Sequence, residues 1–193
     1  MGGPKALLVY DGRPLVWKHV DRAREVGCGE IVVVARREVA CILDRGETPA
    51  HGAATGGHSG ARVVVSEELE PAGSLAVGVR ALGAASIVLV SPVDVVPASD
   101  QTIELLFKAI FAGAVAATPV FGERGGHPVV CRREVLDRYA GERPHPSLRD
   151  VLDSLGDRRA RVRVSDESVT IDLNRPEDVF ARTGAAPVFW RPS

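Results

Sequence analysis

Two acidic residues, Asp94 and Asp172, follow apolar strand-like segments, where α/β sheets often bind ligands. Asp94 comes shortly after residues 86–91 (SIVLVS), and Asp172 lies in the segment TIDLNRPED. Ligands bind outside the carboxyl ends of such strands, and carboxylate oxygens are suitable ligands for Mg²⁺. Asp94 is therefore either a metal ligand or a cap for the turn or helix that follows it. If Asp172 faces Asp94 across the sheet, the two carboxylates form a Mg²⁺ site.

The first residues of the chain carry groups that suit a phosphate. Gly2 and Gly3 allow close approach of the backbone, and Lys5, after Pro4, supplies a compact positive charge. The same composition is also common in terminal segments that bind nothing.

Two further segments combine polar side chains with backbone that could bind an anion. Ser74 precedes a predicted helix, where it either caps the helix or joins free backbone N–H groups in holding an anion or a ribose. Gly126, His127 and Pro128 begin a predicted strand. His127 is either structural or a hydrogen-bonding partner for a phosphate or a pterin-like ring.

These candidates need a sheet that brings them together, and the pattern of the chain predicts one. Strand-like and helix-like segments alternate almost throughout, which is typical of an α/β domain with a mixed, mostly parallel sheet between helices, a three-layer arrangement. We expect one domain over residues 1–193, with a flexible loop over 46–60. Strands are expected at 30–35, 62–65, 86–91, 114–120, 126–131, 161–164 and 168–173, and helices at 14–26, 37–43, 74–82, 100–111, 132–139, 147–155 and from about 176.

Composition excludes several classes of protein. The chain has 24 basic and 25 acidic residues, a formal net charge of -1, so a broad attraction to nucleic acid or to an anionic membrane is not expected. We see neither a signal peptide nor an apolar stretch of about 18 residues that would cross a membrane. Three cysteines without CxxC spacing argue against a disulfide framework or a zinc site, and a cytoplasmic location is expected.

Five motifs occur in an order that resembles a known family. They are MGGPKALL (1–8) with GRPL (12–15), GSLAVGVRAL (73–82), SPVDVVPASDQTIELL (91–106), GERGGHPVVC (122–131) and IDLNRPEDV (171–179). The chain resembles, over nearly its whole length, the molybdenum cofactor cytidylyltransferases and their guanylyltransferase relatives, a MobA-like nucleotidyltransferase family.

The resemblance implies a Rossmann-like, nucleotide-diphospho-sugar transferase (GT-A-like) fold. It also implies transfer of CMP or GMP from CTP or GTP to a molybdopterin cofactor, with release of pyrophosphate. The product would pass to a molybdoenzyme or its chaperone. The residues that the resemblance assigns are Gly2, Gly3, Pro4, Lys5 and Ser74 to the nucleotide, Asp94 and Asp172 to Mg²⁺, and Gly126, His127 and Pro128 to the acceptor, with Lys5 and Asp94 as the catalytic pair.

The family's first strand and glycine-rich turn, LAxGxSxR, have no counterpart in this sequence. Because that strand lies in the middle of the sheet, its loss leaves two neighbours unpaired. An unpaired buried backbone group costs about 1–3 kcal/mol, whereas a typical domain is stable by only about 5–15 kcal/mol. We therefore expect either a marginal fold or strands that close up, and translation starts either at Met1 or upstream of it.

Smaller departures leave the acceptor and the activity open. Asn174 and Arg175 stand where the closing motif of the family has Asp and Thr, and Val96 replaces a proline. A second enzymatic hypothesis keeps the fold and takes a sugar phosphate or another phosphorylated metabolite as acceptor. A third is an inactive relative that binds or delivers the cofactor.

Overall fold

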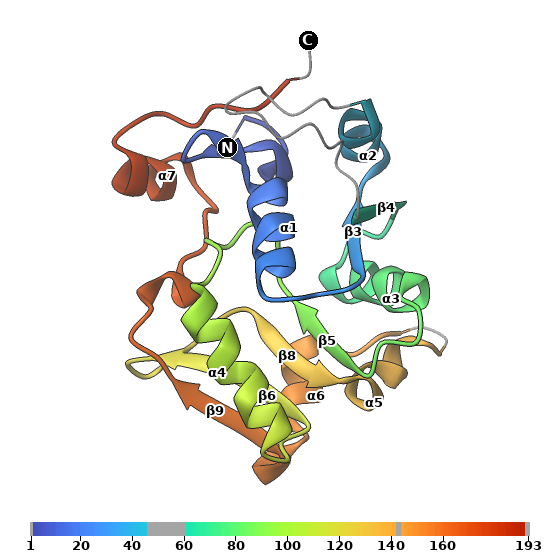
Figure 1. Cartoon of the computed structure of the whole chain (residues 1–193). Helices are drawn as coiled ribbons and strands as arrows, with labels where there is room; N and C mark the ends of the chain where they lie inside the picture. The colour runs from blue at the N-terminus through green and yellow to red at the C-terminus, as the bar shows by residue number, and fades with distance from the viewer. Residues whose placement is uncertain (1, 46–60, 142–143, 192–193) are drawn as a thin grey trace.

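The computed structural model describes residues 2–45, 61–141 and 144–191, and the loop expected over 46–60 lies outside them. The described strands fall into two main groups, separated in space (Figure 1). A larger group has five strands and a smaller one has two, and helices cover both. A further two-stranded ribbon joins β1 (Val9–Tyr10) and β2 (Arg13–Pro14), after a short 3₁₀ helix η1 (Lys5–Leu7).

Alternate side chains of the larger sheet belong to two different buried clusters. Ala116, Val129 and Cys131 belong to one buried cluster, whereas Ala117 and Val130 belong to another. Successive residues of a strand point to opposite faces, so each face of this sheet is buried. The strands run in the order β5 (Ile87–Val90), β8 (Val129–Arg132), β6 (Ala116–Phe121) and β7 (Arg124–Gly125), with β9 (Arg159–Arg163) also paired to β6.

Different helices cover the two faces of the larger sheet. On one face, α4 (Asp100–Phe111) packs Leu106 and Ile110 against β6, β8 and β9. The cluster on the other face draws its helical residues from α3 (Pro71–Ala81), α5 (Arg133–Leu136), η2 (Asp137–Tyr139) and α6 (Leu148–Asp153). The expected α/β architecture with a sheet between helix layers is confirmed for this part of the chain.

The smaller group pairs β3 (Ile31–Ala35) with β4 (Ala61–Val65) in parallel. Trp17 of α1 (Leu15–Glu25) and Val39 of α2 (Arg37–Arg45) pack in one cluster with alternate β3 residues. On the opposite face α3 comes so close that a Cβ on Gly78 would lie 3.0 Å from Val34 Cγ2. Helix α3 therefore borders both parts of the sheet.

The expectation of a mostly parallel sheet is wrong for the described strands. Two pairings are parallel, β3 with β4 and β6 with β9, and four are antiparallel. The reason is that β8 runs back between β5 and β6, and that a tight turn at Gly122, with φ of +59°, folds β7 onto β6. The sheet is mixed, as expected, but dominated by antiparallel pairs.

The helix predicted from Ser74 and the strand predicted at 168–173 both differ from the structure. Helix α3 begins at Pro71, with Glu70 as its N-cap, so Ser74 lies inside the helix and does not cap it. Proline suits the first turn of a helix, where its missing N–H costs nothing. The strand expected at 168–173 is the 3₁₀ helix η4 (Glu167–Thr170) followed by a single bridge, because the Asp166 carboxylate accepts the Ser168 N–H and starts a turn. The chain also forms η3 (Gly156–Arg158) and α7 (Pro176–Thr183).

A cavity of about 1210 Å³ lies where the two parts of the sheet fail to meet. Strands β3 and β5 both line it and do not pair with each other in the described structure, so the expected closing up of strands is wrong.

Within residues 2–45, 61–141 and 144–191, no helix combines the length and the apolar character needed to cross a membrane.

Candidate functional site

Lys5 is held in place by contacts between the two ends of the chain. Trp190 donates its backbone N–H to the Leu7 carbonyl at 2.8 Å, and Leu8 forms an isolated bridge with Phe189. Gly3 is required here, because a Cβ would lie 2.8 Å from the Phe189 ring. Leu7 and Leu8 are buried beneath this contact. The 3₁₀ turn that carries Lys5 is therefore anchored on both sides.

The Lys5 ammonium joins two segments that are far apart in the sequence. Its Nζ lies 3.0 Å from Asp94 Oδ2, and it also donates a hydrogen bond to Asn174 Oδ1. The side chains of Lys5 and Asp94 are 32% and 33% exposed, so both are reached by solvent. An anion could therefore reach the Lys5 ammonium, and a cation the Asp94 carboxylate, directly from solvent.

The segments that carry Asp94 and Asp172 run side by side. Val95 and Asp172 form an antiparallel bridge, and the Leu173 N–H donates to the Asp94 carbonyl at 2.7 Å. The Asp172 side chain is exposed. The structure thus brings together the two acidic segments expected from the sequence, beside Lys5.

The residues present fit a divalent cation that is shared with a substrate. In the part of the chain that the structure describes, no group of three or more His, Cys, Asp and Glu side chains could hold a metal by itself. Mg²⁺ does not need such a cage, since it is usually bound by one or two carboxylates together with substrate phosphates and water. Asp94 already holds a cationic group, the Lys5 ammonium, at 3.0 Å.

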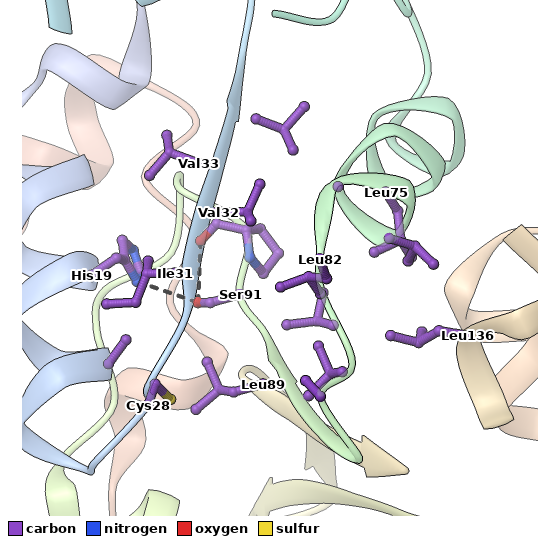
Figure 2. Close-up of a pocket in the computed structure, with 18 of the residues that line it drawn as sticks. His19, Cys28, Ile31, Val32, Val33, Leu75, Leu82, Leu89, Ser91 and Leu136 are labelled. Atoms are coloured by element: carbon purple, nitrogen blue, oxygen red, sulfur yellow. Dashed lines mark hydrogen bonds between the residues drawn. The ribbon is translucent and has the colours of Figure 1, made fainter. Parts of the chain in front are cut away.

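His19 supports the Asp94 segment, and sequence reasoning missed it. Its Nε2 lies 3.0 Å from the Val95 carbonyl. Its Nδ1 lies 3.3 Å from Ser91 Oγ (Figure 2). Because a carbonyl only accepts, Nε2 donates and Nδ1 accepts from the Ser91 hydroxyl. Burial lowers the pKa of His19 to about 4, so the imidazole is neutral at pH 7. His19 thereby contacts the Ser91 side chain and the Val95 backbone, which flank residues 92–94.

The Gly126-His127-Pro128 segment lies near the same carboxylates. The His127 N–H donates to the Val169 carbonyl at 2.8 Å, and the His127–Pro128 peptide bond is cis. The Nδ1 atom of the His127 ring is buried and has no hydrogen-bond partner among the described residues. Burial lowers the pKa of His127, and the Asp172 and Asp94 carboxylates partly offset this. His127 is therefore within electrostatic reach of both carboxylates, and its buried Nδ1 has no hydrogen-bond partner among the described residues.

The remaining residues predicted to bind the nucleotide are Ser74, Gly2 and Pro4. Ser74 lines the cavity that also reaches Asp94, but its backbone N–H donates to the Glu70 carbonyl within the helix. It offers no free helix N-terminus, and only its hydroxyl remains as a candidate contact. Gly2 and Pro4 are exposed at the rim beside Lys5.

The sequence matches the model of a known protein family. The family model of the MobA-like NTP transferase domain matches residues 1–161. The chain belongs to this family. A nucleoside triphosphate is therefore the class of substrate that its membership implies, and the chain is a nucleotidyltransferase-type enzyme. No curated protein matches the sequence.

Solved structures share the fold of this MobA-like domain at low sequence identity. Rv0371c from Mycobacterium tuberculosis H37Rv is 20% identical with a TM-score of 0.76, over 96% of this chain and 91% of that one. Its complex with manganese has a TM-score of 0.74 at 20% identity, over 95% and 94%. The 4-diphosphocytidyl-2C-methyl-D-erythritol synthase from Anaerococcus prevotii DSM 20548 has a TM-score of 0.70 at 15% identity, over 94% and 93%. One structural relative therefore binds a divalent metal.

Proposed function

We propose that this MobA-like domain transfers CMP or GMP from CTP or GTP to the terminal phosphate of a molybdopterin cofactor, with Mg²⁺ as the metal. The observation that carries the proposal is the Lys5–Asp94 pair at 3.0 Å, with the Asp172 segment bridged alongside it. The proposal treats residues 1–193 as one GT-A-like domain. It places the reaction in the cytoplasm, with a molybdoenzyme or its chaperone receiving the product.

In this reaction an oxygen of the acceptor phosphate attacks the α-phosphorus of the nucleotide. A new P–O bond forms, the bond to the β-phosphate oxygen breaks, and pyrophosphate leaves with the electron pair. Such transfers need positioning and charge neutralisation more than covalent help from the protein. Mg²⁺ held by Asp94 and Asp172 would neutralise charge on the phosphates.

Lys5 supplies the second positive charge for the nucleotide. Without ligand its ammonium is balanced by Asp94 and hydrogen-bonded to Asn174. If Asp94 held Mg²⁺, the Lys5 ammonium could donate to a phosphate oxygen, a charge-assisted bond. Gly2, Gly3 and Pro4, which precede Lys5 in the chain, are assigned to the same phosphates.

The acceptor is assigned to the side of Gly126, His127 and Pro128. The unpaired Nδ1 of His127 gives this side a buried hydrogen-bonding group, and a buried group of this kind costs free energy until a partner arrives. The Ser74 hydroxyl, on the cavity wall, is assigned to the ribose or base of the nucleotide.

A second candidate keeps the donor and changes the acceptor. The structural likeness to a 4-diphosphocytidyl-2C-methyl-D-erythritol synthase supports an acceptor that is a sugar phosphate or another phosphorylated metabolite. The third hypothesis, an inactive binding or delivery protein, predicts no turnover with any acceptor.

Pyrophosphate release distinguishes these candidates. CTP and GTP are each incubated with Mg²⁺ and either molybdopterin or a panel of sugar phosphates. The proposal predicts release with molybdopterin, and a loss of about 100-fold or more in Asp94→Asn, since electrostatic groups of this kind contribute at that level. The control Asp100→Asn, an exposed position paired with Arg22, keeps full activity. Release only with sugar phosphates supports the second candidate, and release with none overturns both.

A further inference from the structure

Strand β9 lies at the margin of the larger sheet and has one open edge (Figure 1). In the described structure it pairs only with β6, in parallel. The Val164 N–H, just after β9, donates to the Val120 carbonyl of β6 at 3.0 Å. Because successive amides of a strand point in opposite directions, the N–H groups of Arg161 and Arg163 point away from β6. No described residue accepts a hydrogen bond from these two N–H groups.

The residues with free backbone groups also carry free positive charges. Side chains two apart on a strand share a face, so Arg159, Arg161 and Arg163 lie on one face of β9, whereas Val162 on the other face packs in the cluster beneath α4. Arg159 is paired with Asp153 at 2.8 Å. Arg161 and Arg163 are exposed, and their side chains form no ion pair or hydrogen bond with another described residue. The open edge therefore carries two unpaired guanidinium groups on residues whose Cα atoms are about 7 Å apart.

These features suit an extended segment with acidic side chains on one face and apolar side chains on the other. Such a segment would add a strand to β9 and pair with its free backbone groups, a common mode of peptide recognition. Its Asp or Glu side chains would lie beside Arg161 and Arg163, and opposite charges on neighbouring strands stabilise a sheet. Its apolar side chains would extend the surface that Val162 forms with Ala109 of α4.

Other occupants fit this edge less well. Pairing of β9 with β9 of a second copy would bring arginines beside arginines, and like charges on neighbouring strands destabilise a sheet. A nucleic acid offers phosphates to the guanidinium groups but no row of amide donors for the strand carbonyls. The formal net charge of -1 also gives a nucleic acid no wider attraction to the protein.

We propose that the open edge of β9 is a docking site for an extended segment of a partner protein, in which Asp or Glu alternates with apolar residues. The two arginines both attract such a segment and repel a second β9, and specific interfaces commonly combine attraction with repulsion of this kind. The inference goes beyond the proposed function and does not rest on it.

Amide hydrogen exchange followed by NMR tests this proposal with two synthetic peptides of about eight residues, a length suited to one strand. One peptide repeats Glu-Val and the other repeats Lys-Val, both with capped ends. At saturation the Glu-Val peptide should slow exchange of the Arg161 and Arg163 amides by at least about tenfold, and the Lys-Val peptide should leave it unchanged. The Val164 amide, which already bonds to Val120, is the internal control.

A third peptide separates strand pairing from simple attraction of charge. A Glu-Pro repeat keeps the carboxylates, but its prolines have no N–H to donate, so it should bind at least about tenfold more weakly than Glu-Val in a calorimetric titration. Equal binding of the two acidic peptides overturns the proposal, as does a lack of saturable binding of Glu-Val up to about 1 mM.

Charge reversal tests the two arginines themselves. The double variant Arg161→Glu, Arg163→Glu should lose at least about tenfold in affinity for the Glu-Val peptide and should gain binding of the Lys-Val peptide. The control Arg80→Glu, at an exposed arginine of α3, should bind Glu-Val as the native chain does. An equal loss in Arg80→Glu overturns the proposal. So does a single-stranded oligonucleotide that displaces the peptide from β9, because nucleic acid is then the partner.

Discussion

Replacing Gly126 with alanine adds a methyl group that meets the Val169 backbone. Gly126 lies on the side of the site that is assigned to the acceptor. Its Cβ would lie 2.0 Å from the Val169 carbonyl oxygen and 2.6 Å from the carbonyl carbon. Contacts below 3.0 Å are essentially unknown for real Cβ atoms. The segments that carry Gly126 and Val169 must therefore move apart, so that this distance grows from 2.0 Å to at least 3.0 Å. The same carbonyl accepts the His127 N–H at 2.8 Å, and the separation breaks that bond.

The size of the effect follows from these two changes. Overpacking of this kind costs about 1–3 kcal/mol, and a lost hydrogen bond adds about 1 kcal/mol. The expected decrease in the free energy of unfolding is therefore about 2–4 kcal/mol. Since a displacement of 1 Å can cost about 100-fold in rate, we expect nucleotidyl transfer to fall by a similar factor in the folded variant.

Urea unfolding of Gly126→Ala and Gly125→Ala measures the difference. Gly125 is the matched control, because a Cβ there meets no heavy atom within 4 Å, and alanine at such a position should change stability by less than about 1 kcal/mol. Equal stability of the two variants would refute the close approach of Gly126 to Val169. Equal activity of the two folded variants would show that His127 has no part in the reaction.

Two further predictions concern charged groups. Lys5→Met should weaken binding of CTP or GTP by about tenfold or more in a calorimetric titration, because a charge-assisted bond to phosphate is lost. The control is Lys18→Met, since Lys18 pairs with Asp11 on the surface, and this variant should bind the nucleotide normally. Burial raises the pKa of Asp166, but hydrogen bonds from Ser168, Ser99 and Thr102 outweigh it and hold that pKa below 3.8. Asp166→Asn should therefore lose about 1.5–3 kcal/mol of stability at pH 7. The difference in stability between the variant and the native chain in urea unfolding should narrow as the pH falls below 3.8, where the unfolded carboxylate gains a proton, and on through the lower pKa of the folded carboxylate. A gap that stays constant from pH 7 to pH 3 would contradict that assignment.

The positions of the site segments were predicted largely from the order of motifs. Asp94 and Asp172 follow strand-like segments, and the resemblance supplied Lys5 as their neighbour. Asn174 stood out in the sequence only as a departure from the family, yet its side chain contacts Lys5. His19 carried no signal, because its helical position fits an ordinary amphipathic pattern and its partners, Ser91 and Val95, are more than 70 residues away in the chain.

Strand direction and two element boundaries could not be predicted from local patterns. Apolar alternation does not distinguish a parallel from an antiparallel neighbour, and the reversal of β8 between β5 and β6 depends on long-range topology. The apolar run at 168–173 looks like a strand, but the Asp166 carboxylate binds the Ser168 N–H at 3.1 Å and turns the chain instead. Such side-chain bonds to the backbone compete directly with strand pairing.

Calorimetric titration of CTP and of GTP into residues 1–193, with and without Mg²⁺, tests the shared role of Lys5 and Asp94 most directly. The account predicts binding of at least one nucleotide that strengthens with Mg²⁺, and loss of that strengthening in Asp94→Asn. Binding that is equally strong without Mg²⁺ and in Asp94→Asn, or no binding of either nucleotide, would contradict it.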